Sequence, residues 1–318
     1  MPAPSSSLAT LRPELGGCME EFDLAMDRQG FIGLQVLPVK EVNVQAGSFG
    51  IIPIEQLLKK RTTNRAPGAA YARGDWKFEP ATFATKEEGL EGVVDDREAK
   101  MYTNYFDAEV ATLQLTVDGL LREFETAIAD QIFNATTWTP TAVTNEWDDF
   151  TNATPITDVN ARVKAMWEAT GIWANSLIIN KRVFRNLRQC DDITEKIRSI
   201  DPKFQGEVGI DHLRQAFDLP NIIVAGSAKN SAGQPNLTIA PVWSDEYAAV
   251  ARIAETDNIK EPCVGRTFHW SEDGSSIGGT AETYREENVR GNVVRCRLDV
   301  DRKLLYTAAL QLLSNITT

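Results

Sequence analysis

The chain has few cysteines and histidines and no long apolar run. Its 318 residues include two histidines and four widely spaced cysteines, Cys18, Cys190, Cys263 and Cys296. No Cys-x-x-Cys pair occurs, so we expect unpaired thiols in a reducing compartment. No segment approaches the ~18 consecutive apolar residues of a membrane-spanning helix. The first residues contain no apolar run flanked by basic residues, so we also expect no secretory signal.

The sequence also lacks every common catalytic or phosphate-binding motif. It contains no GxxxxGK[ST], no GxGxxG after a strand, no HExxH and no GxSxG. His212 falls in an amphipathic stretch and His269 among aromatic residues, so both are interpreted as structural. Adjacent carboxylates and the GSSIGG segment at 274–279 are interpreted as solvated surface. We therefore predict no catalytic, cofactor-binding or metal-binding residue, although an active site assembled from scattered residues would leave no motif.

Positive charge is concentrated in one short stretch of an acidic chain. Lysine and arginine number 33 against 45 aspartates and glutamates, a net charge of −12. The stretch 59–73 holds five basic residues and no acidic one, so the rest of the chain has 28 against 45. An acidic surface repels DNA, whose binding depends on neutralising phosphates with basic side chains. The basic stretch therefore favours an acidic protein surface as its partner, although a solvated mobile loop remains the alternative.

The first hundred residues predict an arm followed by a long projection. Residues 1–30 mix Pro, Ser and Gly with a short amphipathic piece at 19–26. Residues 31–54 are β-type, and an extended return strand follows the basic stretch. Together, 49–98 are interpreted as one long hairpin with the basic residues at its tip. A ribbon of this kind is marginal in water by itself, so we expect it to lie on another subunit.

The clearest single element is a helix over 107–134. Its apolar residues recur at intervals of three and four, which is the period of one helical stripe, and Asp107 is placed to cap its start. From 156 to 255 the pattern alternates amphipathic helices with short buried strands, such as SLIIN at 176–180 and NIIVAG at 221–226. The chain then ends in two β-type segments placed on either side of 299–302.

This order of elements resembles the major capsid proteins of tailed bacteriophages, which have the HK-ninety-seven-like fold. The resemblance covers roughly 30–316 and rests on the joint order of several stretches rather than on one motif. These stretches are FIGLQVLPVKEV, the hairpin with the helix 107–134, NEWDDFTNATPITDVNARVKAMWEATGIWANSLIINKRVFRNL, GIDHLRQAFDLPNIIVAG and VRGNVVRCRLDVDRKLLYTAAL.

The resemblance implies an α+β fold built from four parts. An N-terminal arm would span 1–48 and an extended β-hairpin loop 49–98. A peripheral domain would take 99–154 and 256–318, with the helix 107–134 as its spine. An α/β axial domain would take 155–255.

The implied function is a structural coat protein rather than an enzyme. It would form hexamers and pentamers of an icosahedral phage head, assembled in the host cytoplasm, that encloses double-stranded DNA without sequence-specific binding. Portal and scaffolding proteins and a decoration protein are implied partners, with no membrane and no cofactor. The alternatives are an encapsulin-type compartment shell and, in a different class, a soluble α/β enzyme or ligand-binding protein.

We predict that the basic tip contacts an acidic part of a neighbouring subunit. One candidate target is the acidic run that follows the loop, and a second is Asp148 with Asp149. The predicted contact residues are Lys59, Lys60, Arg61, Arg65, Arg73, Glu87, Glu88, Glu91, Asp95 and Asp96.

Overall fold

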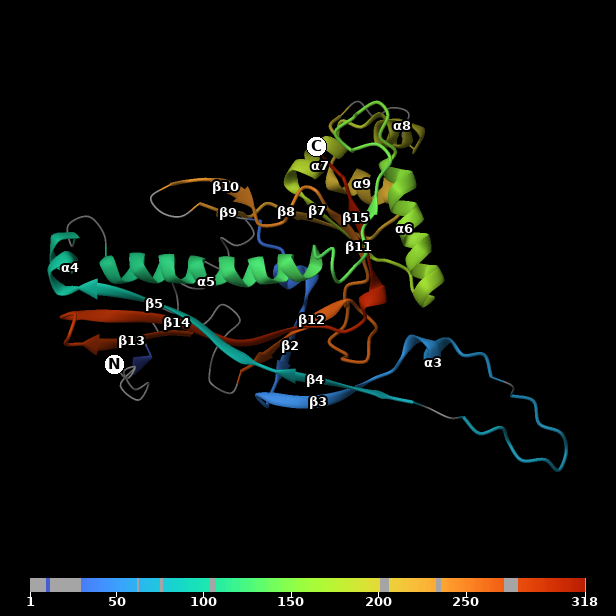
Figure 1. Cartoon of the computed structure of the whole chain (residues 1–318), viewed down its shortest axis with the longest axis horizontal. Coiled ribbons are helices and arrows are strands. Elements are labelled where there is room, and N and C mark those ends of the chain that lie inside the picture. The colour runs from blue at the N-terminus through green and yellow to red at the C-terminus, as the bar shows by residue number, and fades with distance from the viewer. Residues whose placement is uncertain are drawn as a thin grey trace.

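The computed structural model describes residues 10–11, 30–61, 63–74, 77–102, 107–200, 206–232, 236–271 and 280–317. The amphipathic piece at 19–26, Cys18 and the GSSIGG segment at 274–279 lie outside these residues. Within the described part, no helix combines the length and hydrophobicity needed to cross a membrane. The elements form two larger sheets, one long helix and two small ribbons (Figure 1).

The larger sheet is organised around one long strand, β14 (Gly291–Leu304). β13 (Thr280–Glu286) and then β12 (Gly265–Trp270) pair with successive parts of one edge of β14. β5 (Lys86–Asp95) pairs antiparallel with the other edge. β1 (Thr10–Leu11) and β2 (Val39–Val42) complete the two ends, β1 on β13 and β2 on β12.

The long helix α5 (Ala108–Ile132) packs against this sheet on β5 and β14. Its start is fixed by Asp107, whose carboxylate accepts hydrogen bonds from the backbone N–H groups of Glu109 and Val110. Its apolar stripe and the even-numbered residues of β14 from Val294 to Val300 are buried in one common core. The predicted helix over 107–134 is therefore confirmed within two residues at its end.

The second sheet has five strands in the order β6 (Thr141–Ala142), β15 (Leu310–Ser314), β11 (Ala248–Ala251), β7 (Ser176–Asn180) and β8 (Asn221–Ala225). Four helices surround it, α6 (Pro155–Thr170), α7 (Lys181–Leu187), α8 (Asp191–Ile200) and α9 (Ile210–Phe217). The helix α6 ends at Gly171, which adopts the left-handed conformation that glycine tolerates best. A second core, which includes Trp147 and Met166, fills the space between helices and strands.

Two ribbons and four short helical segments complete the part of the chain that the structure describes. One ribbon pairs β3 (Ala46–Ile51) with β4 (Glu79–Ala84), and the other pairs β9 (Ala228–Asn230) with β10 (Ile239–Pro241). The short helices are α2 (Gly33–Val36), α3 (Ile54–Leu58), α4 (Asp96–Tyr102) and the single 3₁₀ turn η2 (Thr307–Ala309). The β9–β10 ribbon is tied to α5 because the Arg122 guanidinium donates to the Ala228 carbonyl.

A buried carboxylate joins three distant parts of the chain. Glu125, in α5, is 2% exposed and accepts hydrogen bonds from Ile32 N at 2.8 Å and Gly33 N at 2.7 Å. It also accepts one from the indole Nε1 of the buried Trp243 at 2.6 Å. Burial raises the pKa of Glu125 against the opposing effect of these three donors. The carboxylate therefore holds the start of α2 and the segment before β11 on the same point of the long helix.

The structure corrects three boundaries predicted from the sequence. Residues 86–95 leave the predicted hairpin and pair with β14, and Val94 joins the core that they share with α5. The predicted break around 299–302 does not occur, since β14 continues to Leu304 and the chain turns at η2. Residues 310–314 and 141–142, assigned by sequence to the peripheral domain, pair in the sheet of β7, β8 and β11.

Candidate functional site

The most distinctive surface feature is the segment between β3 and β4. The two strands pair antiparallel from Ala46 opposite Ala84 to Ile51 opposite Glu79. Beyond this ladder the chain forms α3, and the remaining described residues up to 78 contain no further helix or strand. Figure 1 shows this segment extending away from both sheets at one end of the molecule. We call residues 52–78 the projecting loop.

The base of the projecting loop is fixed to the body. Phe49 and Phe83 of the ribbon pack on Phe268 of β12, with ring centroids 5.5 and 4.8 Å from that ring. The Asp301 carboxylate of β14 accepts a hydrogen bond from Ala84 N at 3.0 Å. The Tyr306 hydroxyl donates to the Ile52 carbonyl at 3.0 Å. These contacts set the direction in which the loop leaves the body.

The predicted basic residues occupy the loop beyond this anchored base. Lys59, Lys60, Arg65 and Arg73 are exposed, and no carboxylate among the described residues pairs with any of the four. Arg65 donates from Nε to the Ala69 carbonyl and its guanidinium lies 4.6 Å from the Tyr71 ring centroid.

Arg61 differs from the other four basic residues. It is half-buried and contacts the Gln56 side chain at 3.4 Å. The structure therefore places four exposed positive charges, those of Lys59, Lys60, Arg65 and Arg73, on the projecting loop without a carboxylate partner among the described residues.

The predicted acidic residues lie elsewhere, on β5 and at the start of α4. Glu88 forms an ion pair with Arg302 of β14, and the Glu91 carboxylate lies 3.7 Å from the Arg295 guanidinium. The structure therefore brings these carboxylates to arginines of their own chain rather than to the basic loop tip.

Three further acidic residues complete this run. Asp96 forms a two-pronged pair with Arg285, at 2.6 and 2.7 Å, which lowers the pKa of the Asp96 carboxyl. Asp95 accepts from Arg97 N and so caps α4. Glu87 stands directly opposite Asp299 on β14, so two carboxylates face each other there.

The second predicted target, Asp148 with Asp149, lies in the turn that precedes α6. Asp149 is exposed and accepts hydrogen bonds from the backbone and side chain of Asn152, which lower its pKa. The predicted contact itself, between this turn or the acidic run and a neighbouring subunit, stays a prediction.

The two histidines were interpreted from the sequence as structural, and the structure shows the surroundings of each. His269 lies in β12 and is 2% exposed, and burial lowers its pKa. His212 accepts a hydrogen bond from Gly209 N at the start of α9.

The cysteines Cys190, Cys263 and Cys296 are buried free thiols, and burial raises the pKa of each. Over the described ranges, no three His, Cys, Asp or Glu side chains gather as a metal site would require.

Sequence reasoning did not identify two features of the structure. Trp167 and Trp173 stack with ring centroids 5.5 Å apart near the end of α6, although both are exposed. Glu125 belongs to no motif and was interpreted from the sequence as part of the polar face of the helix 107–134, yet the structure buries it. A buried carboxylate is unusual enough to mark a structural junction.

Comparisons with known proteins match the fold but not the sequence. No family model matches the chain, and no curated protein matches it. A phage-related protein from Bordetella bronchiseptica RB50 aligns over 97% of this chain and 98% of its own, at 17% identity and a TM-score of 0.68. The capsid of cyanophage P-SCSP1u aligns over 88% and 86%, at 12% identity and 0.56. A holo-encapsulin complex from Synechococcus elongatus PCC 7942 aligns over 89% and 86%, at 11% identity and 0.53.

These structures have in common the fold of shell-forming proteins. The chain has the α+β fold of phage capsid proteins, which encapsulins share, along nearly its whole length. The resemblance drawn from the order of sequence elements is therefore confirmed at the level of the fold. Phage capsids outnumber encapsulins among the similar structures, which include a prophage capsid protein and the capsid of phage XM1.

Proposed function

We propose that the protein is a major capsid protein that assembles into the hexamers and pentamers of an icosahedral phage head around double-stranded DNA. The observation that carries the proposal is the projecting loop on a capsid fold. Its base is anchored by aromatic packing and by Asp301, while four of its basic side chains have no carboxylate partner among the described residues. A projection with unneutralised charge and no core of its own fits a contact with another copy.

The mechanism of assembly follows from many weak contacts. Each subunit of a shell touches several neighbours, so individually weak contacts add up to a stable assembly. Charge complementarity between the loop tip and an acidic neighbour fixes register and speeds encounter more than it adds affinity. Such exposed contacts are screened beyond about 8 Å at physiological ionic strength, so added salt weakens them.

Negative-stain microscopy and sedimentation of the purified full chain test the shell proposal. We expect capsomers or closed shells. A monomer or small dimer at high protein concentration, together with turnover of a substrate, would instead support the soluble-enzyme alternative and overturn the capsid proposal.

The role of the loop tip is tested by Lys59→Glu combined with Arg61→Glu. We expect these reversals to impair assembly, or to give shells that dissociate at lower salt or temperature than wild type. The matched control is Lys164→Glu combined with Lys196→Glu, which reverses two exposed lysines on α6 and α8. Shells of the loop variant that resist salt and heat as well as wild type would refute the contact.

An encapsulin-type compartment shell is the second candidate, because an encapsulin is among the similar folds. The two differ in contents and partners. A phage head implies portal and scaffolding proteins, with a decoration protein as a further partner, and a place in the virion after assembly in the host cytoplasm. An encapsulin shell purified from its native cell would contain a cargo enzyme, which mass spectrometry of intact shells would detect.

A further inference from the structure

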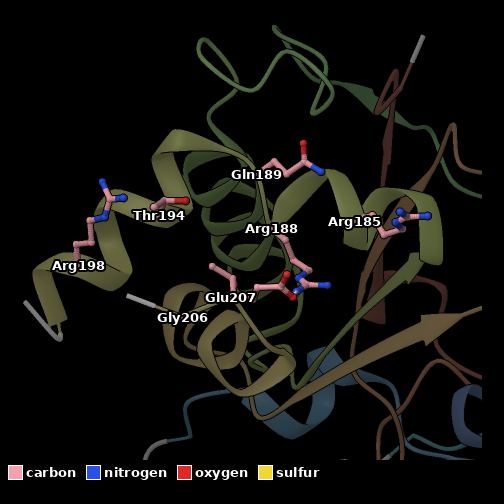
Figure 2. Close-up of a pocket in the computed structure, with 8 residues that line it drawn as sticks. Arg185, Arg188, Gln189, Thr194, Arg198, Gly206 and Glu207 are labelled. Atoms are coloured by element: carbon pink, nitrogen blue, oxygen red, sulfur yellow. The ribbon is translucent and has the colours of Figure 1, made fainter. Parts of the chain in front are cut away.

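A groove rich in arginine lies on the helices that surround the five-stranded sheet. It is formed by α7, by α8 and by the residues that precede α9, and its volume is about 420 Å³. Its polar lining includes Arg185, Arg188, Gln189, Thr194, Arg198 and Glu207. Figure 2 shows Arg198 and Arg185 toward the two ends of this groove, with Arg188 and Glu207 together between them. We call it the arginine groove.

The charges of the arginine groove are only partly neutralised. Glu207 pairs with Arg188 across the groove. Arg185 and Arg198 are exposed, and neither has a carboxylate partner in the part of the chain that the structure describes. Among the described residues that line the groove, three guanidinium groups against one carboxylate give a local charge of +2 in a protein whose total is −12.

The chemistry of the lining suits an oxyanion such as phosphate. A guanidinium group presents a rigid fork of donors that matches two oxygens of a phosphate or a carboxylate at once. The described lining contains no aromatic side chain on which a nucleotide base could stack, so contacts would go to phosphates and not to bases. Carboxylates are available nearby, because α8 itself begins with Asp191 and Asp192. They nevertheless leave Arg185 and Arg198 unpaired.

The distribution of the arginines favours a chain of phosphates over a single ion. Because Arg185 on α7 and Arg198 on α8 lie toward opposite ends of the groove, successive phosphates of a polyanion can contact both (Figure 2). We propose that the arginine groove binds a run of phosphate groups, supplied by single-stranded nucleic acid or by inorganic polyphosphate. Recognition is independent of base sequence. Glu207 limits the affinity because it already occupies Arg188.

The salt dependence of binding follows from the number of phosphates neutralised. For single strands the logarithm of the binding constant falls with the logarithm of salt concentration with a slope of about −0.7 for each phosphate. Arg185 and Arg198 together therefore predict a slope of about −1.4. The overall negative charge of the protein makes binding weak, so it is measured at low ionic strength.

Fluorescence anisotropy of a labelled oligothymidylate with the purified full chain measures this slope. In Arg185→Ala combined with Arg198→Ala we expect severalfold weaker binding and a salt slope shallower by about 1.4. Lys196→Ala is the control, because it removes an exposed positive charge from α8 outside the groove and should change nothing. In Glu207→Gln we expect tighter binding and a slope steeper by about 0.7, since Arg188 becomes available. A misfolded variant would not produce this gain.

Competition experiments identify which molecule supplies the phosphates and test an acidic protein segment as the alternative ligand. Displacement of the oligonucleotide by polyphosphate supports the phosphate site, and binding of polyphosphate alone assigns the source to free polyphosphate. Equal displacement by polyglutamate would overturn the proposal in favour of an acidic protein segment. So would unchanged binding in the double arginine variant, or equal loss in Lys196→Ala. None of these outcomes depends on whether shells form, so the capsid proposal is tested separately.

Discussion

Replacing Glu125 with glutamine tests the junction between the long helix, the start of α2 and the segment before β11. The two side chains have nearly the same shape, so the exchange leaves no cavity. One carboxylate oxygen accepts from both Ile32 N and Trp243 Nε1, and the other accepts from Gly33 N. In glutamine the amide oxygen can replace the first of these. The amide nitrogen then faces the Gly33 N–H, and neither group has an acceptor.

The expected cost is the balance of two opposing effects. A buried donor left without a partner costs about 1–3 kcal/mol, and the two remaining hydrogen bonds lose their charge assistance. Against this, glutamine avoids the cost of burying a negative charge, which is the reason the pKa of Glu125 is raised. We therefore expect Glu125→Gln to lower the free energy of unfolding at neutral pH by about 1–2 kcal/mol.

The pH dependence of the free energy of unfolding provides an independent check, because its sign follows from the pKa shift of Glu125. Because the folded pKa of Glu125 lies above its usual 4.5, the folded state binds the proton more tightly than the unfolded state. The stability that this group contributes is therefore largest below pH 4.5 and falls as pH rises toward the folded pKa. Glutamine does not titrate. The difference between wild type and Glu125→Gln should consequently grow as pH is lowered through this range.

Urea unfolding of the purified full chain, followed by tryptophan fluorescence at several pH values, measures both effects. Sedimentation at each pH checks that the two proteins are in the same oligomeric state, because assembly also changes apparent stability. Equal stability at neutral pH together with superimposable pH profiles would show that the carboxylate does not hold this junction.

Three further changes probe other parts of the structure. In Gly33→Ala the new Cβ would lie 2.5 Å from the nearer Glu125 oxygen, so we expect a loss of about 1–3 kcal/mol in urea unfolding. Phe268→Ala removes a fully buried ring beneath the projecting loop and should cost about 3–5 kcal/mol, with faster proteolysis of the loop as a second readout. Asp96→Asn breaks an exposed pair with Arg285 and should leave the thermal midpoint nearly unchanged. The lowered pKa of Asp96 means that any contribution it makes is present above its unfolded pKa and is lost as pH falls through the folded value, which a thermal scan across acidic pH would detect.

Local signals in the sequence predicted α5 and the end of α6, but they did not predict α8, and α2 lies within a stretch interpreted as β-type. The helix 107–134 was predicted because its apolar spacing and its Asp107 cap are properties of a single segment. Gly171 likewise marks the end of α6 by its own left-handed conformation. In both cases the information that fixes the element lies within a few residues of it.

Strand pairing could not be predicted in the same way. Residues 86–95 have the composition of a return strand in a hairpin, yet their partner is β14, about two hundred residues further along the chain. Alternation of apolar and polar side chains indicates that one face of a strand is buried, but it does not indicate which strand pairs with it. The charged run at 299–302 similarly suggested a break. The strand continues because Asp299 lies within reach of Arg297 and Asp301 accepts from Ala84 N.

For the charged residues that we predict to form an interface, the sequence indicated the location of the basic ones but not the pairing of the acidic ones. The sequence correctly indicated that basic residues occupy a projection. It could not indicate that Glu88, Glu91 and Asp96 are matched with Arg302, Arg295 and Arg285, because those arginines lie on strands far along the chain. The arginine groove was not predicted, because the residues that line it come from separate segments of the chain.

These internal pairs narrow the choice of acidic target for the loop tip. A carboxylate that already has an arginine partner gains little from a second cation. Glu87 is different, because it is exposed, has no cation partner among the described residues and stands opposite the buried Asp299. Burial and the proximity of Glu87 both raise the pKa of Asp299, so the two carboxylates repel each other. A lysine or arginine from a neighbouring subunit would relieve that repulsion. We therefore predict that, within the acidic run, the part nearest the loop base contacts the basic tip of another copy.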